Sequence, residues 1–225
     1  MAKPEQLIET TSVLNGSEIR ERLARSEPDE RLVVSPILGL KEQLRDDQAS
    51  LDVRLGFQFA LMVPSLIDAV DECEVGAPPL STLFTTRHVP FGDRIVIHPH
   101  QFILGATLEY IRLPMDLMAY VMGRSTWGRL GLIVATAVGI QPGFAGTLTL
   151  ELRNLGEAPL SLYPGQVVAQ LFFHRVNQLK KTGKGLGQYS GAVDILPKRL
   201  SPKATHDTLH KLRKAFKKKR KTPSH

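Results

Sequence analysis

The residues best suited to chemistry form a short polar run, Gly123-Arg124-Ser125-Thr126, between two apolar segments. Arg124 offers a fork of N–H donors, and the two hydroxyl groups and the backbone amides of the run add more. Arg129 follows about one helical turn later on the same side, within reach of the same ligand. Such donors suit phosphate oxygens. From spacing alone, however, a capped surface turn with solvated arginines is the favoured interpretation.

Glu151 is the second candidate, because it stands in a segment where polar and apolar residues alternate. One face of the expected strand carries Thr147, Thr149, Glu151 and Arg153. The other face carries leucines. A carboxylate in this position is either a solvated edge charge, the usual outcome, or a general acid/base held among arginines of a neighbouring strand.

The sequence lacks the residues that other known types of hydrolytic or nucleotide-binding site require. Zinc-dependent deamination of a base needs a histidine and two cysteines at fixed spacing, and Cys73 is the single cysteine. His98 and His100 form the closest histidine pair, which is better explained as lining a turn than as binding metal. No serine-hydrolase elbow, Walker loop or Gly-x-Gly-x-x-Gly motif occurs. We therefore expect no metal site and no protein-bound cofactor.

Composition predicts a soluble, single-domain protein. The chain has 225 residues, 42% of them hydrophobic and 23% charged. No apolar run approaches the roughly 20 residues of a membrane span, and the first residues lack the apolar core of a signal peptide. A single cysteine makes a reducing, cytoplasmic location the default expectation.

The net charge of +7 is concentrated at the C-terminal end. Residues 198–225 contain eleven lysines and arginines and one acidic residue, so the rest of the chain is mildly acidic. Leu209, Leu212 and Phe216 fall at helical spacing, which predicts a short basic amphipathic helix. This tail could contact polyanions, but the charge gives no reason to expect a nucleic-acid-binding body.

The elements expected to position the candidate residues are short strands. From residue 89 onward, apolar runs alternate with turn signals rich in Gly and Pro, which indicates a barrel or sandwich. The runs are 94–98, 102–113, 119–122, 132–137, 147–152, 160–162 and 167–176. One short helix is expected near 125–130, with Ser125 as its N-cap. We predict an all-β fold with short peripheral helices.

The first part of the chain contains fewer regular signals. A surface helix should begin near Asn15 and end before Pro28, followed by β-prone segments at 32–34 and 51–59. Residues 63–86 have few periodic cues and are interpreted as an irregular insertion. The predicted organisation is a leader (1–14), one domain (15–197) with an insertion at about 60–86, and the basic tail (198–225).

Several of these motifs resemble the dCTP deaminase family in order and spacing. They include Asp52-Val-Arg-Leu-Gly56, Gly123-Arg-Ser-Thr-x-x-Arg-Leu-Gly-Leu132, Pro142-Gly-Phe-x-Gly146, Leu148-Thr-Leu-Glu-Leu-x-Asn154 and Leu162-Tyr-Pro-Gly-Gln166. The resemblance covers roughly residues 14–192. It implies a homotrimer of distorted β-barrels of the β-clip type, a fold shared with dUTPases, with active sites between subunits.

The resemblance also implies a role for each candidate. Arg124, Ser125, Thr126 and Arg129 would hold the phosphates, and Ser125 and Arg129 would also position the attacking water. Ala137 would offer its backbone to the base, and Glu151 would be the proton shuttle. The nucleotide pocket would be lined by Thr149, Leu150, Gln170 and Tyr189. The family uses no zinc, and Mg²⁺ would enter with the triphosphate.

Two departures leave alternatives to deamination of dCTP to dUTP. Gln141 stands where the family and dUTPases usually carry an aspartate; an amide can hydrogen-bond a 3′-hydroxyl but is a poor base. The closing segment keeps Tyr189 and Gly191 but differs at its other positions. One alternative is a nucleotide-binding sensor on the same fold. The other is a dUTPase or a bifunctional enzyme forming dUMP, with dUTP or dTTP as further ligands.

Overall fold

The computed structural model describes residues 13–64, 70, 80–136, 139–177, 195, 211–212 and 214. The chain divides into two compact units. The first comprises 1–61 and 86–195 and contains the large sheet; the second comprises 62–85 and 196–225. The predicted leader lies almost entirely outside the described residues, as does most of the predicted basic tail.

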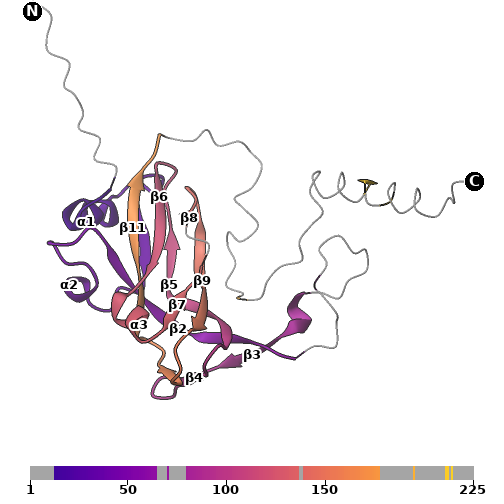
Figure 1. Ribbon diagram of the computed structural model, residues 1–225. Helices are drawn as coiled ribbons and strands as arrows, with labels where there is room; N and C mark the ends of the chain where they lie inside the picture. The colour runs from indigo at the N-terminus through magenta and orange to yellow at the C-terminus, as the bar shows by residue number, and fades with distance from the viewer. Residues whose placement is uncertain are drawn as a thin grey trace, which may run out of the picture. The chain divides into compact units, whose positions relative to one another are not determined.

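The first unit is built around an antiparallel sheet (Figure 1). Its strand order is β7 (Leu132–Val134), β9 (Ala145–Asn154), β5 (Phe102–Arg112), β2 (Leu51–Met62), β11 (Val167–Arg175), β6 (Leu117–Gly123) and β8 (Gly139–Ile140). Off this path, β1 (Val33–Ser35) pairs with β5, and β3 (Phe84–His88) pairs with β2. A separate pair joins β4 (Ile95–Ile97) to β10 (Leu160–Leu162). The all-β prediction is confirmed.

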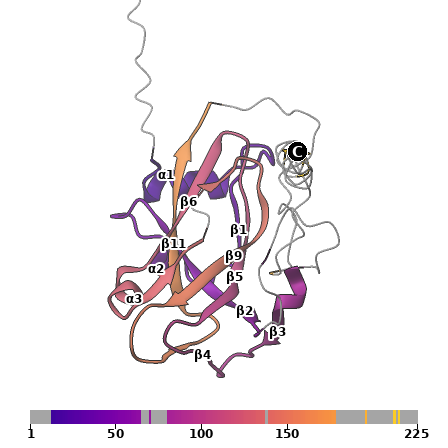
Figure 2. The same ribbon diagram turned by 45° about the vertical axis from the view of Figure 1, so that its right-hand side comes forward.

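The sheet curls so that strands distant in its order approach each other (Figure 2). Four strands separate β6 from β7 along the path. Even so, a Cβ atom added to Gly123, at the end of β6, would lie 3.3 Å from Cγ2 of Val134 in β7. This curling gives the first unit the distorted barrel character that the family resemblance implied.

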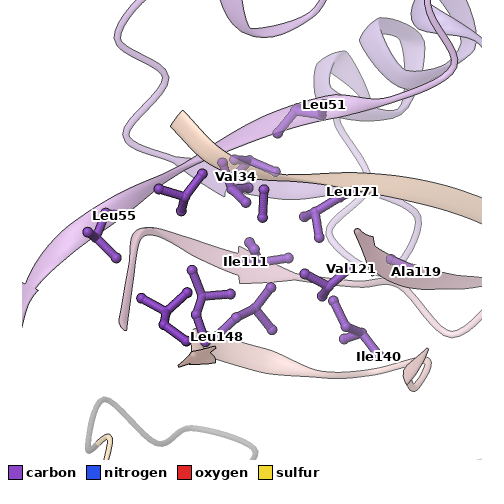
Figure 3. Close-up of a cluster of buried hydrophobic side chains, with 14 of the residues drawn as sticks. Val34, Leu51, Leu55, Ile111, Ala119, Val121, Ile140, Leu148 and Leu171 are labelled. Atoms are coloured by element: carbon purple, nitrogen blue, oxygen red, sulfur yellow. The ribbon is translucent and has the colours of Figure 1, made fainter. Parts of the chain in front are cut away.

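The core lies inside the curled sheet and is formed by side chains from many strands (Figure 3). Leu51 and Leu55 of β2 meet Ile111 of β5 and Leu171 of β11, all fully buried. Buried and partly buried residues alternate along β9, as the sequence predicted, with the leucines facing the core. In β2, by contrast, consecutive residues are buried, and Asp52 is among them.

The segment just before the N-terminal helix α1 (Gly16–Ala24) is bonded to β11. Asn15 caps the helix as predicted, accepting from the backbone N–H of Glu18 at 3.0 Å. The N–H of Leu14 donates to the carbonyl of Phe173 at 2.9 Å. Arg22 makes two bonds to the carboxylate of Asp116, at 2.8 and 2.6 Å, which ties the helix to the turn before β6.

The segment predicted to be irregular is partly regular. β2 continues to Met62, and a 3₁₀-helix η1 (Leu80–Leu83) leads directly into β3. Phe84 and the two threonines after it suit a strand that pairs with β2, and this tertiary pairing outweighs the weak local signal. A short helix α2 (Leu40–Gln43) was also not predicted.

The helix predicted in the basic tail is described at Lys211, Leu212 and Lys214, which are helical. Across the described residues, no helix has both the length and the apolar character needed to cross a membrane.

Candidate functional site

Helix α3 (Ser125–Arg129) begins within the polar run, one residue earlier than predicted. Arg124, in extended conformation, is the N-cap residue, and Ser125 is the first helical residue. The carbonyl of Arg124 accepts from the N–H groups of Trp127 and Gly128, at 3.0 and 3.1 Å. The Trp127 indole donates to the carbonyl of Val167 at 2.9 Å, so the helix is anchored to β11.

The run presents one half-buried arginine and several exposed side chains. Ser125, Thr126 and Arg129 are exposed, while Arg124 retains 34% of its side-chain exposure. Nη1 of Arg124 donates to Oδ1 of Asp52 at 2.5 Å. This bond uses one of five guanidinium N–H donors, so the rest can meet an anion at the open side.

Asp52 is held in turn by a buried polar network. The amide Nε2 of Gln43 donates to the Asp52 carbonyl at 3.0 Å and to Oε1 of Glu109 at 2.9 Å. The Glu109 carboxylate also accepts from the backbone N–H and from Nη1 of Arg54, at 2.8 and 3.2 Å. Burial raises the pKa of Glu109, while the bonds from Arg54 act in the opposite direction.

Glu151 lies half-buried on β9, and its backbone is fixed on both sides. Its carbonyl accepts from the N–H of Ala135 at 2.8 Å, and its own N–H donates to Oγ1 of Thr136 at 3.0 Å. Burial raises the pKa of its carboxyl group above the usual value for Glu. A carboxyl group whose pKa is raised in this way accepts a proton more readily than a solvated one, which suits a general acid/base.

Within one chain, the structure does not join Glu151 to the polar run. Among the described residues, no hydrogen bond or ion pair reaches the Glu151 carboxylate, and neither Arg124 nor Arg129 contributes to its pKa shift. The neighbouring arginine considered for Glu151 from the sequence is therefore not found within the described part of this chain.

The remaining predicted residues occupy varied positions. Thr149 is half-buried on the Glu151 face of β9, whereas the Leu150 side chain is fully buried in the core, so only its backbone can contact a ligand. Gln170 lies on β11 beside Asp52 and accepts a long bond from Ser50, at 3.4 Å. Gln141 is exposed in the turn before β9. Ala137 and Tyr189 lie outside the described residues.

Two glycines fix α3 relative to β9. Gly131 has a φ of +92°, and a Cβ atom there would lie 2.5 Å from the backbone nitrogen of Gly156. The N–H of Leu155 donates to the carbonyl of Gly131 at 2.8 Å. Asn154, which is buried, accepts from the N–H of Gly156 at 2.9 Å and donates to the carbonyls of Ile97 and Ala158. The segment after α3 is thereby fastened to the end of β9.

Sequence reasoning assigned no role to Asp52, Gln43 or Glu109. A signal was nevertheless present. Asp52 and Arg54 interrupt one apolar segment and Glu109 interrupts another, and charged residues in such segments are seldom buried unless they are paired. What the sequence does not show is which charges pair.

Comparisons with known proteins agree with the fold and with the matching motifs. A family model described as dCTP deaminase-like matches residues 13–176. A dCTP deaminase of Halorubrum lacusprofundi is 38% identical over 183 residues, covering 81% of this chain and 86% of the relative. A dUMP-forming dCTP deaminase of Methanobrevibacter smithii is 37% identical, covering 72% and 79%.

Among solved structures, the 2′-deoxycytidine 5′-triphosphate deaminase of Agrobacterium tumefaciens matches with a TM-score of 0.55 at 23% identity. The match covers 74% of this chain and 49% of that longer one, and it supports the fold. The matched family model spans nearly all of the described sheet and both candidate site segments. The chain belongs to the dCTP deaminase family.

Proposed function

We propose that this protein removes the exocyclic amino group of dCTP by hydrolysis, forming dUTP and ammonia. The observation that carries the proposal is Glu151, a half-buried carboxylate with a raised pKa on the polar face of β9, in a chain of this family. The substrate assignment is supported by relatives whose names state that they act on dCTP.

The reaction needs one group that can take up and release protons. Glu151 removes a proton from the attacking water as the oxygen bonds to C4 of cytosine. It delivers this proton to N3 and then transfers the second water proton to the amine, so that the C4–N bond breaks and ammonia leaves. Ser125 and Arg129 hold the water and the carbonyl group, and Arg124 binds phosphate oxygens. Mg²⁺ accompanies the triphosphate as part of the substrate.

A second candidate, formation of dUMP with loss of pyrophosphate, is favoured by relatives whose names state that activity. That step requires activation of a second water for attack on phosphorus. Gln141 occupies the position where the family usually has an aspartate, and an amide cannot serve as the base. Gln141 therefore supports dUTP as the product.

The product assay separates these activities. Incubation of the protein with dCTP and Mg²⁺ should release ammonia and dUTP in equal amounts, without pyrophosphate, when the products are measured by coupled assay and anion-exchange chromatography. Equal release of pyrophosphate and ammonia would establish the dUMP-forming reaction instead. Binding of dCTP without any ammonia would point to a nucleotide sensor.

We further propose that the active site is completed in a homotrimer. In one chain, no described cationic group bonds the Glu151 carboxylate or contributes to its pKa shift, and apolar side chains around α3, β7 and the end of β9 are uncovered. These are Leu130, Ile133 and Leu155, which retain 54%, 40% and 52% of their exposure. A subunit interface over this surface would bury them and supply cationic groups next to Glu151.

The proposed trimer can be tested by its mass and by the effect of one interface variant. Light scattering at micromolar concentration should give about three times the chain mass of 24.9 kDa. Ile133→Asp should dissociate the assembly and abolish ammonia release, because it places a charge in an apolar contact. The matched control is Leu38→Asp, which changes a 60% exposed leucine between β1 and α2, outside α3, β7 and β9, and should remain trimeric. A monomeric wild-type protein that retains full activity would contradict the shared site.

A further inference from the structure

We infer that Asp52 is a positioning residue for Arg124, fixing the guanidinium so that its free N–H groups meet the triphosphate of dCTP. This inference rests on the proposed function, because it assigns Arg124 the phosphate-binding role. It concerns a residue that contacts no substrate and acts through another side chain.

The contact itself is unlike a surface ion pair. The side chain of Asp52 is 12% exposed, and its carboxylate bonds the guanidinium at 2.5 Å. In comparison, Asp46 and Asp47, which pair with Arg20 and Arg45, are 79% and 67% exposed. A solvated pair samples many geometries, whereas a buried carboxylate restricts the direction of the arginine bound to it.

Asp52 is also fixed at its backbone, independently of Arg124. Gln43 holds the Asp52 backbone carbonyl, and Gln43 is itself bonded to Glu109 and to Arg54. Glu109 and Gln43 are buried, with 0% and 2% of their surface exposed. The position of Arg124 is therefore coupled through one side chain, Asp52, to a buried network that runs from α2 to β5.

The backbone of Arg124 is fixed independently of this network. Its N–H donates to the carbonyl of Val168 at 3.1 Å, and its carbonyl begins helix α3. Loss of the Asp52 carboxylate would therefore leave the main chain in place and release the side chain. The expected consequence is weaker and less directional phosphate binding, with the reacting groups around Glu151 unaffected.

The test compares dCTP affinity in a double-mutant cycle of Asp52→Asn and Arg124→Ala. D52N preserves the shape of the side chain and should raise the Kd for dCTP about tenfold, the lower end of the loss expected when charge-assisted bonds to phosphate are weakened. The effect should appear in KM rather than in kcat. R124A alone should raise the Kd by about 10- to 100-fold, as expected for lost charge-assisted bonds. D52N should add nothing in the R124A background.

The matched control is Asp47→Asn, which removes an exposed partner of Arg45 and should leave the Kd unchanged. An unchanged or lower Kd in D52N, or full additivity with R124A, overturns the inference. If D52N does not fold, Asp52→Glu replaces it: the displaced carboxylate should still weaken binding, and an unchanged Kd overturns the inference. If the wild type binds dCTP without releasing ammonia, the proposed function fails, while the same cycle measured by titration still decides the role of Asp52.

Discussion

Glu151→Gln should nearly abolish ammonia release while leaving dCTP affinity close to that of the wild type. The amide preserves the shape and hydrogen-bonding capacity of the side chain but cannot accept the proton of the attacking water. Loss of general acid/base catalysis typically costs about 10²–10⁴ in rate, and a group that moves every proton of the reaction should fall at the upper end. Binding should persist because the proposed phosphate contacts lie on α3 and at Arg124, not at Glu151.

The measurement combines steady-state ammonia release with calorimetric titration of dCTP. Glu157→Gln is the matched control, because Glu157 is exposed in the loop after β9 and should have no effect on either quantity. An E151Q variant that retains wild-type turnover would eliminate Glu151 as the shuttle.

The pH profile gives an independent check on the same residue. Burial raises the pKa of Glu151, so its carboxylate, the form that acts as base, is lost as the pH falls through this raised value. The acidic limb of kcat/KM in the wild type should therefore lie at higher pH than the usual pKa of Glu. E151Q should lack this limb in its residual activity.

Of the variants proposed here, Glu109→Ala should have the largest effect on stability. It should lower the free energy of unfolding by about 3–5 kcal/mol. The Glu109 carboxylate is fully buried and accepts hydrogen bonds from the backbone N–H and the guanidinium of Arg54. The Arg54 side chain is itself only 11% exposed. Removing the carboxylate leaves a buried positive charge without its partner. This destabilises the fold more than replacing both partners by apolar residues would.

The stability change can be measured by urea denaturation of the wild-type protein and of each variant at equal protein concentration. Glu21→Ala is the control: Glu21 pairs with Arg25 on the exposed face of α1, where such pairs contribute about 0.3–0.5 kcal/mol. If the two variants had similar midpoints, the buried network would not be a major stabilising element.

The strands of this fold could be predicted because each carries its own signal. β9 alternates strictly, its leucines face the core, and the Gly- and Pro-rich turns separate one strand from the next. The helix at Asn15 has both halves of a capping box. Such features depend on neighbours within a few residues, so a single sequence is sufficient to identify them.

The candidate site was predictable in its parts but not in its connections. Arg124 and Glu151 stand out by residue type and spacing. The Gln43–Glu109 bond, however, joins residues 66 positions apart, and the Arg124–Asp52 bond joins residues 72 apart. Pairing over such distances is determined by strand order, which local patterns do not encode. For the same reason, the β-prone residues of β3 were recognisable only once β2 was available as a partner.

The close approach of Gly131 and Gly156 has a consequence for how this protein can diversify. Neither residue carries a functional group, yet any side chain at either position would separate the segment after α3 from the end of β9. The helix α3 and the strand β9, which these two segments follow, carry Arg129 and Glu151, on which the proposed chemistry depends. Substitution at this junction is therefore limited by spacing rather than by reactivity. Two residues without side chains keep the charged residues of both segments in alignment.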